Sequence, residues 1–174
     1  MINRILFLIV LECAFLSCKG NKELPEVKTL LVQQLKNTHT HQEWFAPTKK
    51  ALEGLTPEQL MWKDSTENHS IGELVSHLIF WNEMNLKAFK GEKVPDYKED
   101  NKETFIRYTS KDWELALKKL DHIQMEWERS TELATATQIA DWNIEIANMA
   151  MHTAYHTGQI VYIRKRNGWW EQCR

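Results

Sequence analysis

The stretch His152-Thr-Ala-Tyr-His156-Thr-Gly-Gln159-Ile-Val-Tyr-Ile-Arg164 lies near the end of the 174-residue chain. Met149, His152, His156, Gln159 and Ile163 follow one another at the three- and four-residue intervals of a single helix face. On a helix, His152 and His156 stack one turn apart and can ligate one metal ion. The stretch therefore predicts a helix and a candidate metal site, provided that the pair faces inward and another helix supplies a third ligand.

Similar patterns predict three further helices. Apolar side chains recur from Leu24 to Leu55 at alternating intervals of three and four, which predicts one long helix kinked at Pro47. Ser70-Ile-Gly-Glu73 is a capping box, and Thr109 with Asp112 is expected to form a second one. The predicted helices run from Pro25 to Glu53, from Ser70 to about Lys90, from Ser110 to Leu133 and from Asn143 to Arg166, with residues 134–140 as a connection and a short helical turn at Thr56-Pro57.

Four helices, each with one apolar stripe, predict an all-α four-helix bundle. The composition agrees, because glycine and proline are sparse and alternating β-branched runs are hard to find. The length suits one domain with a substantial core. The formal net charge is -2, so the chain lacks the basic excess of a nucleic-acid-binding protein, and we expect no nucleic acid among its partners.

The first residues are expected to direct export rather than to fold. An apolar run from Ile5 to Leu11 follows Arg4, is interrupted by Glu12 and resumes through Leu16, and it is too short for an ordinary transmembrane helix. Its end, Phe15-Leu16-Ser17-Cys18, fits a bacterial lipobox, in which the cysteine carries lipid. We therefore expect a signal peptide at 1–17, a tether at 18–23 and a domain at 24–174, in an exported lipoprotein anchored to a membrane through Cys18. An uncleaved N-terminal anchor is the alternative.

The cysteines limit the chemistry of any metal site. Cys13 would leave with the signal peptide and Cys18 would carry lipid, so Cys173 alone would remain as a thiol. One mature chain then has no disulfide framework. A metal site must therefore use histidine and oxygen ligands.

His77 is the candidate third ligand. It lies three residues after Leu74 and four before Trp81, on the apolar stripe of the helix that starts at Ser70. A single inward histidine is usually a packed core residue. Three that converge, His77, His152 and His156, would match a three-histidine site with an open position, suited to zinc, nickel or iron.

Other polar side chains are weaker candidates. His41 falls on the stripe of the first predicted helix, and Glu145 lies two turns before His152, so either could support a ligand ring. Tyr155 could donate a proton, and Gln159 could hydrogen-bond within the bundle. The alternative for each is an ordinary packed or solvated helix residue. His39, His69 and His122 are expected at the surface or in loops, and the tryptophans in the core.

The chain resembles the DinB-like (YfiT-like) superfamily of metal-dependent four-helix-bundle proteins. The matching segments span the mature domain: Glu43-Trp44-Phe-Ala-Pro47, Gly54-Leu-Thr-Pro-Glu-Gln-Leu60, Trp62, Ser70 to His77 with Trp81, and His152 to Ile160 with Arg164. The resemblance implies an up-down-down-up bundle with one long crossover, frequent dimerisation, and a metal triad of His77, His152 and His156. Some relatives are thiol-dependent S-transferases or isomerases, whereas this chain is expected to be exported.

Three functional hypotheses follow. The first is a metal-dependent enzyme that activates water or a small-molecule thiol for transfer or hydrolysis. The second is a non-catalytic, membrane-tethered lipoprotein that binds a metal or a partner. The third is a bundle without a metal.

Overall fold

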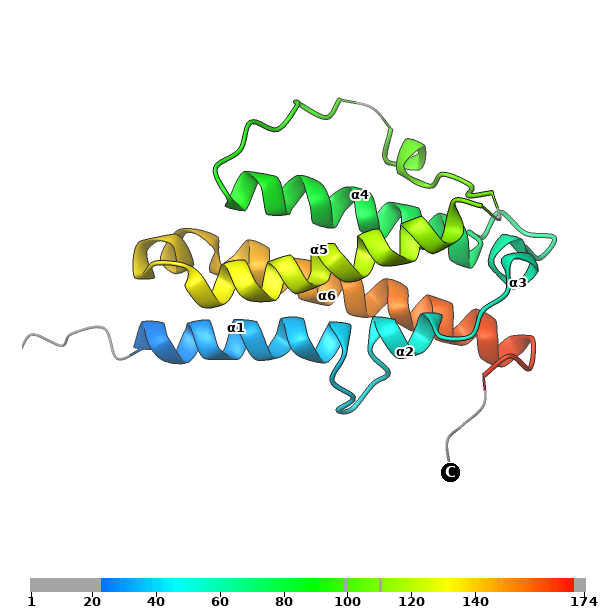
Figure 1. Ribbon diagram of the computed structural model, residues 1–174, viewed down its shortest axis with the longest axis horizontal. Coiled ribbons are helices and arrows are strands. Elements are labelled where there is room, and N and C mark those ends of the chain that lie inside the picture. The colour runs from blue at the N-terminus through cyan, green and yellow to red at the C-terminus, as the bar shows by residue number, and fades with distance from the viewer. Residues whose placement is uncertain (1–22, 99, 110, 171–174) are drawn as a thin grey trace, which may run out of the picture.

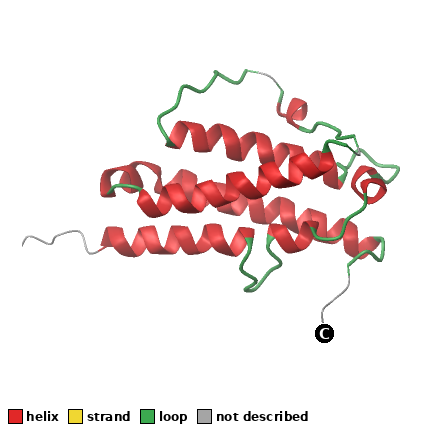
Figure 2. Cartoon of the chain, in the orientation of Figure 1, coloured by secondary structure: helices red, strands yellow, loops and turns green. Residues whose placement is uncertain are grey.

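The structure is a computed structural model that describes residues 23–98, 100–109 and 111–170. These residues form helices and loops and contain no strand (Figure 2). The predicted signal peptide and Cys18 lie outside the described residues. Within those residues, no helix combines the length and the apolarity that crossing a membrane requires. The elements are α1 (Glu23–His39), α2 (Thr48–Leu52), α3 (Pro57–Met61), α4 (Ile71–Phe89), the 3-10 turn η1 (Asn101–Thr104), α5 (Trp113–Leu133) and α6 (Ala136–Arg166).

The four long helices form the predicted up-down-down-up bundle (Figure 1). Helices α1 and α6 run in one direction, and α4 and α5 run in the other. Because α4 and α5 are parallel, the chain between them must return along the whole bundle, and the segment that carries η1 makes this crossover. Helix α4 packs against both α5 and α6, so a side chain on its inner face can meet one from α6.

Side-chain caps start several helices. Ser70 caps α4 as predicted: its hydroxyl accepts from the Glu73 amide, and the Glu73 carboxylate accepts from the Ser70 amide at 2.8 Å. Thr56 caps α3 with Gln59 in the same way. The second predicted capping box, at the start of α5, is wrong. The hydroxyl of Thr109 donates to the carboxylate of Asp112, which caps no backbone amide.

The long first helix is interrupted rather than kinked, which corrects the prediction. Helix α1 ends at His39, and α2 begins after Pro47, whose extended backbone occupies the N-cap position. Proline lacks the N–H that an unbroken helix needs, and it disfavours helical geometry in the residue before it. The Thr48 hydroxyl donates to the Thr38 carbonyl at 2.8 Å and closes the gap. Residues 40–47 therefore loop out, and Trp44 is 99% exposed instead of buried.

Helix α6 begins earlier than predicted. Thr135 is its N-cap, with a hydroxyl that accepts from the Gln138 amide at 3.2 Å. Ile139 on its first turns is fully buried, so burial stabilises a segment that had no clear pattern. The expected connection over residues 134–140 is therefore wrong. The end at Arg166 is confirmed, and Gly168 follows with a φ of 71°.

The core fills the space between the four long helices. Trp127 on α5 is 1% exposed, and its indole N–H donates to the Asn82 carbonyl on α4 at 3.1 Å. Its ring also packs against Phe89, with 5.4 Å between centroids. The other large, fully buried apolar side chains are Ile71, Leu74, Val75, Leu78, Leu120, Ile139, Ile146 and Ile160.

His39 is buried between two carboxylates, although a surface position was expected. Its Nδ1 lies 2.7 Å from Glu128 Oε1, and its Nε2 lies 2.9 Å from Asp121 Oδ1. An ionised carboxylate only accepts, so both ring nitrogens donate and the ring is an imidazolium. Burial alone lowers the pKa of His39, but the hydrogen bonds to Glu128 and Asp121 outweigh burial and raise it. This contact ties the end of α1 to α5.

We expect the His39 contact to stabilise the fold in a pH-dependent way. A raised native pKa contributes stability that is fully present below about pH 6.5 and is lost as pH rises through the native value. Each unit of elevation contributes about 1.36 kcal/mol. Urea unfolding of wild type and His39→Gln at about pH 6 and about pH 9 should show a smaller difference at the higher pH. An equal difference at both would show that His39 is neutral.

Candidate metal centre

Three histidines meet between α4 and α6. His77 comes from α4, and His152 and His156 come from successive turns of α6. One ligand atom from each ring lies within 4.8 Å of the others. The Nε2 of His152 lies 3.0 Å from the Nε2 of His77 and 3.0 Å from the Nε2 of His156. The structure therefore brings together the three predicted ligand residues, and their role as ligands stays a prediction.

Hydrogen bonds at Nδ1 set the tautomers of two rings. The Gln159 side-chain carbonyl can only accept, so His156 Nδ1 donates to it at 2.7 Å. The Thr104 hydroxyl donates its proton to the Asn101 carbonyl at 2.7 Å, so it accepts from His77 Nδ1 at 2.5 Å. With the proton on Nδ1, each Nε2 carries a lone pair. Both lone pairs are directed into the cluster, which is the tautomer a metal ligand needs.

The cluster fits a divalent cation. Burial, together with the neighbouring imidazoles, lowers the pKa of His77 to about 3, and burial followed by the His156 charge lowers that of His152 to about 4. Burial also lowers the pKa of His156. The rings are therefore neutral near pH 7. The Nε2 atom of His152, which faces the Nε2 atoms of His77 and His156, can carry one proton at most. Among the described residues, His152 Nδ1 is one of the few buried polar atoms without a hydrogen bond.

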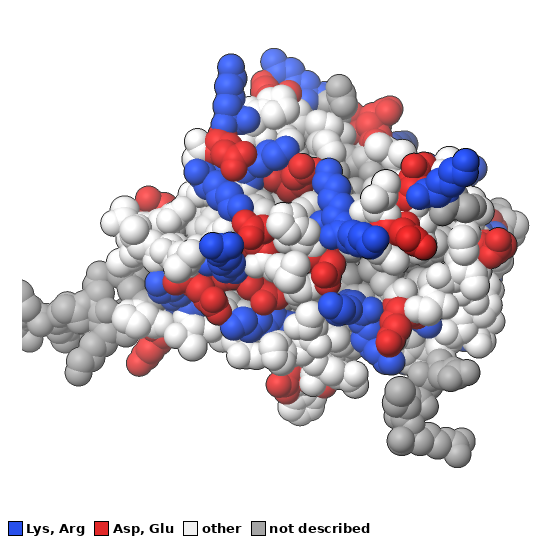
Figure 3. Space-filling view, viewed as in Figure 1, with Lys and Arg blue, Asp and Glu red and all other residues white. Residues whose placement is uncertain are grey.

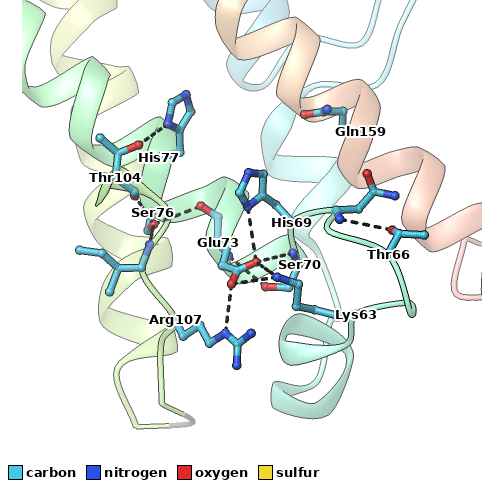
Figure 4. Close-up of polar contacts among 12 residues, drawn as sticks. Lys63, Thr66, His69, Ser70, Glu73, Ser76, His77, Thr104, Arg107 and Gln159 are labelled. Atoms are coloured by element: carbon cyan, nitrogen blue, oxygen red, sulfur yellow. Dashed lines mark hydrogen bonds and ion pairs between the residues drawn. The ribbon is translucent and has the colours of Figure 1, made fainter. Parts of the chain in front are cut away.

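The crossover segment supports His77 from outside the bundle. Phe105 stacks on the His77 ring with 4.1 Å between centroids and 6° between planes. The Ser76 hydroxyl donates to the Thr104 carbonyl at 2.6 Å and accepts from the Ile106 amide at 2.6 Å. Figure 4 shows Ser76, His77 and Thr104 side by side. The sequence carries no signal for Thr104 and Phe105, because a loop has no periodic pattern and neither residue type is itself a sign of a metal site.

The weaker candidates divide into two groups. Gln159 orients His156, and its amide donates to the Tyr155 hydroxyl at 3.4 Å, although Tyr155 is mostly exposed. His41 lies in the exposed loop after α1, so its predicted place on an inward helix stripe is wrong. Glu145 is exposed on α6 and makes no contact with a ring of the cluster among the described residues.

Arg164 plays a structural part at the end of the same helix. Arg164 is 9% exposed, and its guanidinium donates to the carbonyls of Ala51 at 2.7 Å and Glu53 at 2.9 Å. It also donates to the Trp169 carbonyl at 3.0 and 3.2 Å. These bonds satisfy the last carbonyls of α2 and attach it to α6. Arg164 therefore holds the short helix that follows the break at Pro47.

A groove of about 290 Å³ opens onto the centre. His77 and His152 line the groove, and Trp81 and Met149 contribute apolar surface to it. Its remaining lining is carboxamide, from Asn85, Asn101 and Asn148. The Trp81 indole donates to Asn101 Oδ1 at 3.0 Å, which fixes one of these amides. A small molecule can therefore reach the histidines from this side.

A helical bundle whose facing helices present convergent imidazoles has the architecture of a metal-binding four-helix protein. A sequence model of the DinB superfamily matches residues 39–160. The chain therefore belongs to the DinB superfamily, a metal-binding family, and the predicted resemblance is confirmed. Comparison with curated proteins gave no match, and neither did comparison with solved structures.

Proposed function

We propose that this protein is a metal-dependent enzyme whose centre is His77, His152 and His156. One observation carries the proposal: the three Nε2 atoms converge, and Thr104 and Gln159 hold two of the rings with their lone pairs directed inward. Packing alone explains this arrangement poorly, because a proton on His152 Nε2 can serve only one of the two lone pairs that face it. A buried imidazole cluster of this kind is stabilised by a cation.

The donor set suits zinc, nickel or iron, all of which accept imidazole nitrogen. When bound, such an ion supplies Lewis acidity, which lowers the pKa of a water or thiol beside it and so provides a nucleophile for transfer or hydrolysis. The residues of the chain prepare the site for this chemistry. Burial keeps the rings neutral, and the hydrogen bonds at Nδ1 keep the imidazoles in position.

The groove indicates the class of substrate. Apart from the two histidines, none of the side chains that form it is ionisable: they are three carboxamides, an indole and a thioether. Carboxamides both donate and accept, so they suit an uncharged polar molecule that carries amide or hydroxyl groups. Over the face seen in Figure 3, lysine and arginine alternate with aspartate and glutamate, so that face has no broad area of one sign.

We also propose that the enzyme acts at a membrane surface. Export and anchoring through Cys18 would place the domain on a membrane surface, outside the cytoplasm, with residues 19–23 as a tether. The tether would leave the groove accessible from the aqueous side. Association into a homodimer also remains a prediction.

Metal analysis and a turnover screen test the function together. We expect untagged protein to contain one divalent ion per chain, and the loaded form to accelerate ester hydrolysis or transfer of a small thiol. The metal-free form is the matched control, because it differs only in the ion. A stoichiometric ion without turnover of any substrate would favour a non-catalytic metal-binding lipoprotein, and absence of an ion would contradict the proposal.

A further inference from the structure

One face of α6 has no covering element in the part of the chain that the structure describes. The helix runs along the whole bundle in one piece (Figure 1). Four large side chains on this face are between 60% and 66% exposed, namely Ile144, Met151, Tyr155 and Tyr162. With the exposed residues Asn148 and Gly158 between them, they recur at alternating intervals of four and three residues. We call these six residues the α6 stripe, and their spacing is typical of a helix that packs against another helix.

Gly158 within the α6 stripe has no structural reason inside the chain. Glycine destabilises a helix interior relative to alanine. Its φ is not positive, so the backbone at this position does not require glycine. A Cβ atom placed there would meet no atom within 4 Å among the described residues. The close approach of a helix from another molecule would explain so small a residue.

The α6 stripe is complementary to itself when two copies of α6 lie antiparallel. In a two-fold interface whose axis is level with residue 153, each large side chain of the stripe lies opposite another large one, and the glycine lies opposite the asparagine. The residues that face each other across the two chains are then Ile144 and Tyr162, Met151 and Tyr155, and Asn148 and Gly158. Aliphatic and thioether groups thus meet aromatic rings, which is a favourable combination.

Charges at the two ends of the stripe fit the same register. Asp141 lies three residues before Ile144, and Lys165 lies three residues after Tyr162, so both continue the stripe. Both are exposed, and neither has a hydrogen bond or an ion pair within the described part of the chain. The antiparallel register brings Asp141 beside Lys165 of the partner subunit at both ends of the contact. A parallel register would instead place each of these charges beside its own copy.

We propose that the α6 stripe is the contact surface of a homodimer, in which two copies of α6 pack antiparallel with the two-fold axis level with residue 153. The family resemblance implies only that dimers are frequent, and neither the surface nor the register follows from it. A lipid surface fits the stripe less well. A helix that lies on a membrane carries lysine and arginine along its polar face, whereas Asp141 and Glu145 flank one end of this stripe.

The dimer brings the partner subunit to the groove. Asn148 belongs to the α6 stripe and also lines the groove together with His77 and His152. In the proposed register, Gly158 of the partner subunit lies opposite Asn148, so the partner's helix borders the groove on that side. Because glycine has no side chain, the groove stays open there. Two-fold symmetry gives the second groove the same border.

Charge reversal tests the surface and the register together. We expect the full chain to be a dimer by sedimentation equilibrium in density-matched mild detergent. Asp141→Lys and Lys165→Asp each place like charges together at both ends of the contact, so each should raise the dimer dissociation constant roughly tenfold. The double variant restores the attraction and should dimerise like wild type. Lys118→Asp, which reverses an exposed charge on α5, is the matched control and should stay dimeric.

Gly158→Leu tests the close approach without changing a charge. In a single chain the leucine extends into open space and improves the helix, so urea unfolding should show a monomer at least as stable as that of wild type. In the dimer the leucine overpacks the contact with Asn148 of the partner subunit. The dissociation constant should therefore rise roughly tenfold or more.

Several outcomes would overturn the proposal. They are a monomeric wild type, a double charge variant that dimerises no better than the single ones, and a Gly158→Leu variant that dimerises as tightly as wild type. Hydroxyl-radical labelling adds a direct readout, in which Tyr155 and Tyr162 should be protected in the wild-type dimer in detergent and labelled in Asp141→Lys. Protection that appears only in vesicles of phosphatidylethanolamine and phosphatidylglycerol, equally in both proteins, would assign the stripe to a lipid surface instead.

Discussion

Replacing His77 with alanine should abolish stoichiometric metal binding. The variant removes one of three convergent Nε2 atoms, and the two that remain come from a single helix. Losing an outer partner of a ligand typically weakens metal affinity about 10- to 100-fold, so losing the ligand itself should exceed about 100-fold. Metal content after dialysis against the free ion, together with a zinc titration, measures the effect.

The controls separate ligand loss from unfolding. His122→Ala changes an exposed histidine on α5 and should retain the ion. Thr104→Val keeps the shape of the side chain but removes the acceptor for His77 Nδ1, so its affinity should fall between those of wild type and His77→Ala. Circular dichroism should show folded helices in all three variants. A full complement of metal in His77→Ala would reject the assignment of the ligands.

Replacing Trp127 with alanine should cause the largest loss of stability. Its ring is fully buried against Phe89, and its N–H donates to the Asn82 carbonyl on α4. The substitution leaves a cavity and removes this bond between the two helices, and similar aromatic truncations cost about 3–5 kcal/mol. Urea unfolding, followed by circular dichroism, measures the difference in free energy of unfolding.

Trp44→Ala is the matched comparison, because it removes the same side chain from a position that is 99% exposed. Its effect should stay within about 0.5 kcal/mol of wild type. Equal losses in the two variants would mean that Trp127 does not anchor α5 to α4. The pair thus tests the core independently of any metal.

The sequence predicted much of the bundle because much of it is specified locally. The Ser70–Glu73 box starts α4 through bonds between residues three apart, and the periodic apolar positions define which face turns inward. Local patterns failed where distant contacts decide the conformation. Pro47 permits either a kink or a break in the helix. Two contacts stabilise the broken form: the Thr48 hydroxyl donates to the Thr38 carbonyl, and Arg164 attaches α2 to α6.

The metal centre likewise has features that the sequence predicts and features that only the tertiary structure sets. The sequence alone placed His152 and His156 on one helix face and His77 on the inner stripe of another, because helix geometry relates residues a few positions apart. Only the tertiary structure brought Thr104 to His77 and set Phe105 between His77 and His69. Thr104 and Phe105 lie on the crossover, and its path depends on how α4 and α5 pack rather than on any short-range pattern. The tautomer of His77 was decided by the long-range contact with Thr104, whereas that of His156 follows from Gln159, three residues away on the same helix.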